Sequence, residues 1–264
     1  MGMTISTVVG KFLTFPYTTA HYLPQKSYKT TTQQGEDMAS KSGPDIIEDG
    51  LVLCLDAASK RSYPGTGTAW TDLTGSNNGT LTNGPTFDSD NGGSIVFDGT
   101  NDYLESSSNI GITGISPRTF ECWVYVDNYA SANVMGGGTA SGGQLFDTII
   151  WIGGGYLRVI GHYYGAGLDT LSSLPNRNTI NLDQWNHIVH LYDGSDAYLY
   201  TNGEFSNSKT LSLNTGNNKI RMARGFHSAY DYFGGKGGVM RVYNKTFTAD
   251  EIRRNYLSTK ERFA

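Results

Sequence analysis

The segment from Phe247 to Tyr256, which reads FTADEIRRNY, constrains the fold of this chain more than any other. Thr248 and Glu251 have the spacing of a capping box, in which each side chain accepts a hydrogen bond from a backbone amide at a helix start. Phe247 and Ile252 occupy the two positions of a hydrophobic staple, whose apolar contact fixes the entry of the chain into the helix. The sequence therefore specifies a short helix close to its last residue.

The predicted helix, over residues 249–258, follows a chain whose other patterned segments are typical of β-strands. The predicted strands are Leu51–Leu55, Ser94–Phe97, Thr119–Val126, Trp185–Tyr192, Ala197–Thr201 and Gly238–Tyr243. The third alternates, with Phe120, Cys122, Val124 and Val126 on one face and Glu121, Trp123 and Tyr125 on the other. Turn signals such as Asn202-Gly203 separate the strands. We therefore predict an all-β, antiparallel two-sheet sandwich with one short C-terminal helix.

Composition excludes some functions for this chain of 264 residues. Its net charge of −4 lacks the basic footprint of a nucleic-acid-binding protein. No apolar run approaches the ~18 residues of a membrane span, and no secretory signal pattern is seen, so we expect neither a membrane partner nor secretion. Cys54 and Cys122 lie in apolar strand patterns and are expected to be buried thiols, although sequence leaves a bridge between them open.

Residues 1–48 differ from the predicted domain over residues 49–264. The first half is too apolar and aromatic for a solvated tail, has too few strands to fold alone, and precedes a linker-like stretch. We interpret it as an arm that becomes ordered by docking on another surface. The expected assembly residues are Phe12, Phe15, Tyr17 and Tyr22. A disordered leader, or an extra strand on the chain's own domain, remains open.

A series of segments, in their order along residues 50–260, resembles the concanavalin A-like lectin/glucanase family, whose laminin-G-like members are jelly rolls. These segments are Gly50–Leu53, Tyr63–Gly67, Trp70–Gly75, Phe97–Tyr103, Phe120–Val124, Trp185–Val189, Leu199–Glu204, Arg241–Asn244 and Phe247–Ile252. The set is similar to the version found in bacteriophage virion structural proteins. The arm lies outside the resemblance, which implies a jelly-roll fold for the remainder.

The resemblance does not fix a function, because the family includes lectins, glycanases, adhesion modules and virion decorations. Together with the arm, it leads us to expect a phage capsid decoration protein that displays a lectin-like domain. The expected partner is the major capsid protein or a neighbouring copy of the chain, in a virion assembled in the host cytoplasm. The alternatives are a tail-fibre or receptor-recognising protein that binds a cell-surface glycan and, less favoured, a glycoside hydrolase.

Catalytic patterns are weak in this sequence. Retaining glycanases need two carboxyl groups about 5 Å apart, and no Glu-x-Asp-x-Glu run supplies them. Glu121 and Asp127 share a strand face, but two aromatic residues separate them. His187 and His190 fall on opposite faces of one strand, so they cannot hold one metal; we expect a surface residue and a cross-strand partner. We predict that the protein is not an enzyme.

The residue types indicate two candidate binding sites, one for a glycan and one for calcium. Sugar recognition uses exposed aromatic platforms with fixed polar groups, and the glycan-binding candidates are Trp151, Tyr156, His162, Tyr163 and Tyr164. The alternative is that alternate members of this segment, such as Tyr156 and Ile160, fill the sandwich. Calcium is the one cofactor considered, with Asp98, Asn101 and Asp102 as ligands, and Asp72 and Asn77 as a second group. The alternative is that these side chains build turns.

Overall fold

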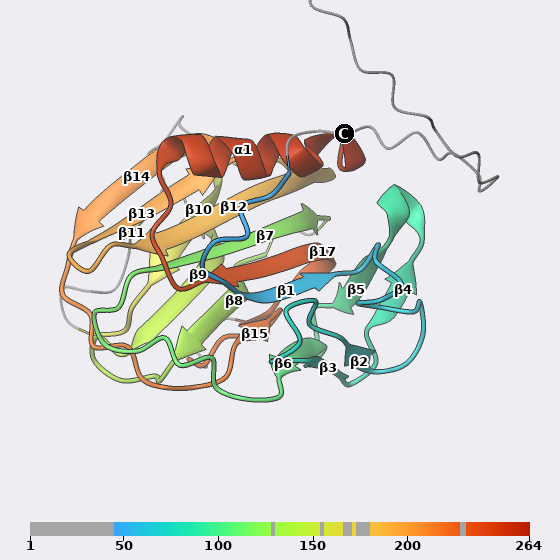
Figure 1. Cartoon of the computed structure of the whole chain (residues 1–264), viewed down its shortest axis with the longest axis horizontal. Coiled ribbons are helices and arrows are strands. Elements are labelled where there is room, and N and C mark those ends of the chain that lie inside the picture. The colour runs from blue at the N-terminus through green and yellow to red at the C-terminus, as the bar shows by residue number, and fades with distance from the viewer. Residues whose placement is uncertain (1–44, 128–129, 154–155, 166–170, 173–179, 228–230) are drawn as a thin grey trace, which may run out of the picture. The chain divides into compact units, whose positions relative to one another are not determined.

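The structure is a computed structural model that describes residues 45–127, 130–153, 156–165, 171–172, 180–227 and 231–264. It is a sandwich of two sheets, here called sheet A and sheet B (Figure 1). Sheet A contains β1 (Leu51–Asp56), β4 (Thr86–Asp88), β5 (Ser94–Asp98), β7 (Arg118–Val126), β12 (Gln184–Tyr192), β13 (Asp196–Thr201), β14 (Glu204–Thr210) and β17 (Gly234–Tyr243). Its strand order is β14-β13-β12-β7-β17-β5-β4, with β1 paired to β17.

Sheet B contains β2 (Ala69–Trp70), β3 (Gly79–Thr82), β6 (Tyr103–Ser106), β8 (Ala132–Gly138), β9 (Leu145–Gly153), β10 (Tyr156–His162), β11 (Leu171–Ser172), β15 (Arg221–Met222) and β16 (Asp231–Tyr232). Its order is β11-β10-β9-β8-β15-β6-β3-β2, and β16 runs parallel to β8. The other strand pairs of the described residues are antiparallel, which confirms the predicted jelly-roll sandwich. Each predicted strand is present, with ends shifted by up to four residues.

The α-helix of the described residues, α1 (Ala249–Thr259), confirms the predicted capped helix. Thr248 N donates to Glu251 Oε2 at 2.8 Å, and Glu251 N donates to Thr248 Oγ1 at 3.3 Å, which together form the capping box. Phe247 and Ile252 are both buried, as the hydrophobic staple requires. Two 3-10 turns, η1 (Asp90–Gly92) and η2 (Lys260–Arg262), complete the helical elements of this part of the chain.

The main hydrophobic core lies between the two sheets. The inner face of β7, formed by Phe120, Cys122 and Val124, packs there against residues of sheet B such as Phe146. Cys54 and Cys122 are both free thiols and both are buried. Cys54 lies on β1 and Cys122 on β7, and β17 lies between these two strands, so the two thiols are not on adjacent strands. Burial raises the pKa of both thiols. The prediction of two buried thiols is therefore confirmed.

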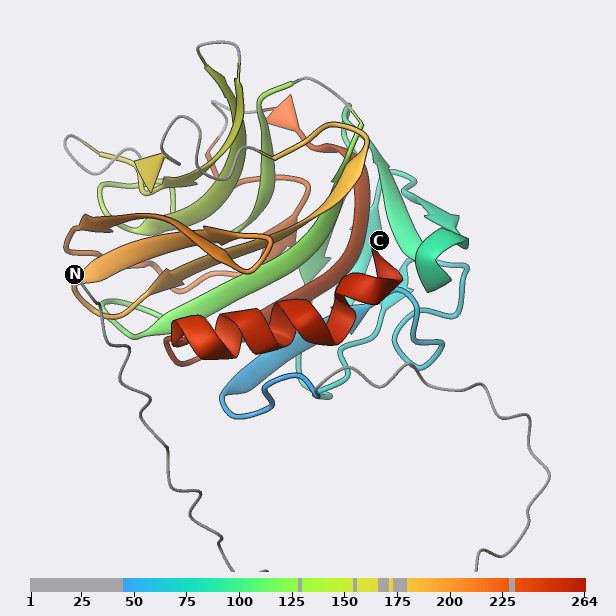
Figure 2. The same ribbon diagram turned by 90° about the horizontal axis from the view of Figure 1, so that it is seen from above.

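Helix α1 lies across the outer face of sheet A (Figure 2). Two further contacts tie the beginning of the described chain to this helix. Ile47 N donates to Asn255 Oδ1 at 2.8 Å, and Arg254 Nε donates to the Asp45 carbonyl at 2.7 Å. Residues 45–48 are therefore held by the helix. The four predicted assembly residues lie outside the described residues, and no helix of the described chain is long and apolar enough to cross a membrane.

Candidate functional site

The outer face of sheet B presents a row of aromatic side chains from β9 and β10. The two strands pair antiparallel, with Trp151 opposite Arg158. Their immediate neighbours Ile150 and Val159 are buried in the core, so alternation places Trp151 and Arg158 on the outside. Trp151 is 39% exposed and Tyr156, two residues before Arg158, is 44% exposed. These two rings form a shallow, accessible platform.

A second aromatic group continues this surface beyond the end of β10. Tyr164 is 36% exposed, and its ring centre lies 4.6 Å from that of His227. The His162 ring centre lies 5.4 Å from that of His227. His162 and Arg158 are four residues apart on β10, which corresponds to about 13 Å along a strand. We call the set Trp151, Tyr156, Arg158, Tyr164 and His227 the aromatic face of sheet B; its first, second and fourth members are exposed and the other two are half-buried. Its length suits an extended ligand rather than a small, enclosed one.

Three of the five predicted glycan-binding residues are exposed rings: Trp151, Tyr156 and Tyr164. His162 is almost buried beside them. Tyr163 is a wrong candidate, because it is fully buried and its hydroxyl lies 2.8 Å from His190 Nε2 in the core. Gly161 makes this possible, since a Cβ there would lie 2.5 Å from the Tyr163 hydroxyl. The alternative that Tyr156 fills the sandwich is also wrong, because its ring is exposed.

A buried carboxyl group, Asp147, lies under the aromatic face and was not predicted. It faces His162 across the β9–β10 pair and is fully buried. Its Oδ2 accepts from Asn133 Nδ2 and from the Phe226 amide, both at 3.4 Å, while its Oδ1 has no partner among the described residues. Burial raises the pKa of Asp147 to about 8. The two hydrogen bonds and the charge of Arg221 act to lower this pKa, but their effects are weaker than that of burial. Asp147 is therefore mostly protonated at neutral pH.

The loop that follows β15 covers Asp147. A Cβ on Gly225 would lie 2.0 Å from Asn133 Nδ2 and 2.7 Å from Asp147 Oδ2, so the loop backbone rests directly on both side chains. Arg221 packs its guanidinium 4.1 Å from the Phe226 ring centre and donates to the Gly225 carbonyl. The one sequence signal for this arrangement was an acid inside the otherwise apolar run LFDTIIWIG.

Chemically, this face offers aromatic stacking, one half-buried cation, Arg158, and, below the surface, one protonated acid. In the described part of the chain, no second carboxylate hydrogen-bonds to Asp147. Glu121, the acid considered for catalysis, lies on the other sheet. The two-carboxylate geometry of a retaining glycosidase is not assembled by these two residues.

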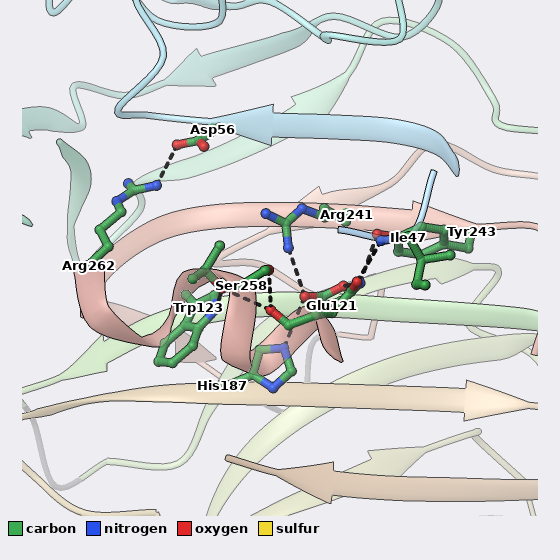
Figure 3. Close-up of polar contacts among 11 residues, drawn as sticks. Ile47, Asp56, Glu121, Trp123, His187, Arg241, Tyr243, Ser258 and Arg262 are labelled. Carbon is green, nitrogen blue, oxygen red and sulfur yellow. Dashed lines mark hydrogen bonds and ion pairs between the residues drawn. The ribbon is translucent and has the colours of Figure 1, made fainter. Parts of the chain in front are cut away.

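Glu121 instead anchors helix α1 to the outer face of sheet A (Figure 3). Its Oε1 accepts from Arg241 Nη1 at 2.9 Å and from His187 Nε2 at 3.0 Å, and its Oε2 accepts from Asn255 Nδ2 at 2.7 Å. Burial acts to raise the pKa of Glu121, but Arg241 and His187 outweigh it and hold the pKa at about 2. The network thus joins β7, β12, β17 and α1.

The expectation that one histidine of β12 lies on the surface is wrong. His187 is fully buried, because α1 covers the face of the strand on which it lies. His190 faces the core, where its Nδ1 lies 3.0 Å from Thr148 Oγ1, and burial lowers the pKa of His190 to about 3. The two rings lie on opposite faces of the strand, as predicted.

The carboxylates among the candidate calcium ligands accept hydrogen bonds from nearby backbone amides. Asp98 Oδ1 accepts from the amides of Thr100 and Asn101 at 2.8 and 3.2 Å, and Asp102 Oδ2 accepts from the Asp98 amide at 3.1 Å. Buried Asp72 likewise accepts from several backbone amides, including that of Asn77 at 3.0 Å. Within the described ranges no group of three or more His, Cys, Asp or Glu side chains is placed to hold a metal. The turn interpretation accounts for the bonded oxygens of Asp98, Asp102 and Asp72.

Comparisons with known proteins place this architecture in a family. Residues 98–253 match the Concanavalin A-like lectin/glucanases superfamily. No curated protein sequence matches the chain.

Solved structures share the fold at low sequence identity. Domain 4 of an extracellular arabinanase from Geobacillus stearothermophilus, solved with arabinotriose, is 15% identical with a TM-score of 0.61, covering 80% of this chain and 100% of that domain. The binding domain of Paraclostridial mosquitocidal protein 1 is 15% identical with a TM-score of 0.60, covering 78% of this chain and 52% of that one. Trypanosoma rangeli sialidase is 14% identical with a TM-score of 0.59, covering 85% of this chain and 37% of the sialidase.

The chain thus spans about half of the toxin domain and just over a third of the sialidase. At these identities the structural similarities show the fold alone. The family match covers more than half of the chain and agrees with the two-sheet architecture. The protein therefore belongs to the Concanavalin A-like lectin/glucanases superfamily.

Proposed function

We propose that the protein is a non-catalytic, lectin-like module that binds carbohydrate through the aromatic face of sheet B and is displayed on a phage virion. The observation that carries the binding proposal is the row of exposed rings formed by Trp151, Tyr156 and Tyr164. Large exposed aromatic groups on a rigid sheet are expensive to leave in water and are typical of ligand-binding surfaces. The same rings offer flat apolar surfaces for the C–H faces of sugars.

Polar side chains beside these rings supply the directional contacts that sugar hydroxyls require. The Arg158 guanidinium lies 5.8 Å from the Tyr156 ring centre, so a half-buried cation with several donors borders that ring. The His227 ring lies beside Tyr164, with 4.6 Å between the ring centres. The arabinanase domain of the same fold was solved with arabinotriose, which supports carbohydrate as the ligand class.

Tyr156→Ala tests the binding proposal. We expect this variant to lose most of its affinity for at least one glycan that the wild-type protein captures on an array, because the stacking platform is removed. Phe205→Ala is the matched control, since Phe205 is similarly exposed at 43% but belongs to β14 of sheet A. Equal loss in both variants, or unchanged binding by Tyr156→Ala, contradicts the assignment to this face. Release of reducing sugar from bound glycan contradicts the non-catalytic part.

Attachment to the virion is assigned to the N-terminal arm. Ordering an arm costs about 1–2 kcal/mol per residue, and burial of its aromatic side chains offsets part of this at roughly 25 cal/mol per Å². Strand addition to an edge of the major capsid protein, or of a neighbouring copy, would satisfy the arm backbone. Display in many copies would raise avidity for a weakly bound glycan. The composition of residues 1–48 and the resemblance to virion proteins support this part.

Deletion of residues 1–44 tests the attachment. The truncation keeps Asp45 and Ile47, whose backbones bind α1, so we expect an unchanged thermal midpoint. Wild-type protein should co-sediment with particles and the truncated protein should not. A full-length variant with Ser at Phe12, Phe15, Tyr17 and Tyr22 should fail in the same way. Incorporation of either variant at the wild-type level contradicts the attachment mechanism.

A further inference from the structure

A second aromatic pocket lies on the opposite side of the sandwich, where η1 and η2 meet the beginning of β12. Its volume is about 440 Å³, and its lining includes Asn91, Tyr125, Asp183, Gln184, Trp185 and Phe263. Pockets that bind small molecules have volumes of roughly 300–1,000 Å³ and combine apolar walls with a few polar groups. From this geometry we propose a second carbohydrate site, which takes a neutral oligosaccharide and is independent of the aromatic face of sheet B.

The aromatic wall of this pocket is held in place before any ligand arrives. Trp185 Nε1 donates to Asn91 Oδ1 at 3.0 Å, while the Trp185 ring packs 4.6 Å from Phe263 and 5.8 Å from Tyr125. Asn91 is fixed in turn, because its Nδ2 donates to the Arg262 carbonyl at 2.9 Å and its own carbonyl accepts from Arg262 Nε at 2.7 Å. A preformed wall lowers the entropy cost of binding.

The polar groups at the rim favour a neutral, hydroxylated ligand. Asp183 and Gln184 are exposed side by side, and Asp183 has a φ of 55° with its amide bonded to the Val126 carbonyl at 2.7 Å. A carboxylate and an amide can accept from and donate to neighbouring sugar hydroxyls. The Asp183 charge disfavours anionic sugars. Lys236 lies near Tyr125 but is paired with Asp88, so it does not offset Asp183.

An adjoining hollow extends the site beyond a single sugar ring. It has a volume of about 290 Å³ and shares Gln184, Trp185 and Phe263 with the first pocket. Trp123 and Tyr256 form its further wall, and their rings are stacked 5.7 Å apart. Trp185 therefore borders both hollows, so rings of one oligosaccharide could pack in each of them. A ligand of two or more residues fits this arrangement better than a monosaccharide.

Titration of the full-length protein with neutral trisaccharides tests the site directly. Arabinotriose, maltotriose and cellotriose serve as probes, and trigalacturonic acid serves as the anionic control. The reporter is the Trp185 indole N–H resonance, assigned with Trp185→Phe, because this group donates to Asn91 at the pocket wall. We expect at least one neutral trisaccharide at millimolar concentration to shift this resonance, and the acidic one to leave it unchanged.

Variants separate this site from the face of sheet B. In a Tyr156→Ala background, the Trp185 response should persist, and adding Gln184→Ala should weaken it at least tenfold with little change in thermal midpoint, since Gln184 is exposed. Asp183→Asn should allow the acidic trisaccharide to bind. The proposal is overturned if no neutral trisaccharide moves the Trp185 resonance, or if Gln184→Ala leaves the response unchanged. The proposal is also overturned if the Trp185 resonance does not respond to sugar and moves only when residues 1–44 are deleted. That result would mean that those residues, and not an oligosaccharide, are the ligand of the pocket.

Discussion

The outer faces of the two sheets use polar groups in opposite ways. On sheet A, helix α1 covers Glu121, and both oxygens of that carboxylate are matched by donors from three separate elements. On sheet B, Asp147 is equally buried, but one of its oxygens has no partner among the described residues. The loop at Gly225 and Phe226 covers Asp147, whereas α1 covers Glu121. The comparison indicates that the part of sheet A under α1 contributes to stability through a fully bonded carboxylate, whereas the face of sheet B, proposed above to bind carbohydrate, keeps a buried acid with an unpartnered oxygen.

The largest expected effect is on the covered face. Glu121→Gln leaves Arg241 buried without its carboxylate, and breaking a buried ion pair typically costs about 3–5 kcal/mol. We therefore expect the free energy of unfolding in urea to fall by that order. The ionised form of Glu121 stabilises the fold above its unfolded pKa of 4.5, and this contribution is lost as the pH falls towards about 2. The variant should show less of this acid sensitivity.

Glu105→Gln is the matched control for this prediction. Glu105 pairs with Lys219 and Arg221 at 2.8 Å, but its side chain is 23% exposed. Partly exposed pairs contribute about 0–1 kcal/mol. Equal destabilisation by the two variants would contradict the special role of the network under α1.

On the other face, Asp147→Asn should change the pH dependence of stability. The folded pKa of about 8 lies above the ordinary value of 3.8, so folding binds a proton between these values. The contribution of Asp147 to wild-type stability should therefore decline as the pH rises from about 4 to about 8. The variant lacks the ionisable group, so its thermal midpoint relative to wild type should rise over the same interval. A constant difference between the two midpoints would show that Asp147 is ionised in the folded protein.

Helix α1 allows the covered face to be weakened in a graded way. Thr248→Ala removes the side-chain acceptor for the Glu251 amide, and loss of such a cap costs about 1 kcal/mol. Thr248→Ser keeps the hydroxyl and should be close to wild type in urea unfolding. If the alanine variant is as stable as the serine variant, the capping box does not contribute to the attachment of the helix.

The smallest stability effect is expected for the exposed rings of sheet B. Tyr156→Ala should change the free energy of unfolding by less than about 0.5 kcal/mol, because substitutions at exposed positions are usually close to neutral. The same variant should nevertheless lose glycan binding at the aromatic face of sheet B. A destabilisation as large as that of Glu121→Gln would mean that this face is structural as well.

Local patterns were sufficient to predict much of the fold. The helix start at Thr248 and the inward face of β7 were predicted because a capping box and a two-residue alternation act within a few residues. Three rings of the aromatic face were also predicted from residue type. Tyr163 and His187 were misplaced, because their burial depends on Gly161 and on α1, and alternation along one strand does not reveal what covers it.

The amino-acid sequence by itself determined the antiparallel sandwich, its capped helix and the identity of the rings available for stacking. The tertiary structure alone decided the chemical state of the two buried acids. Glu121 is ionised because Arg241 and His187 are brought beside it from distant strands, whereas Asp147 is mostly protonated because a loop removes water without supplying a cation close enough to balance the charge. Long-range packing sets both the solvent access and the charge around each group, so neither state follows from its sequence neighbours.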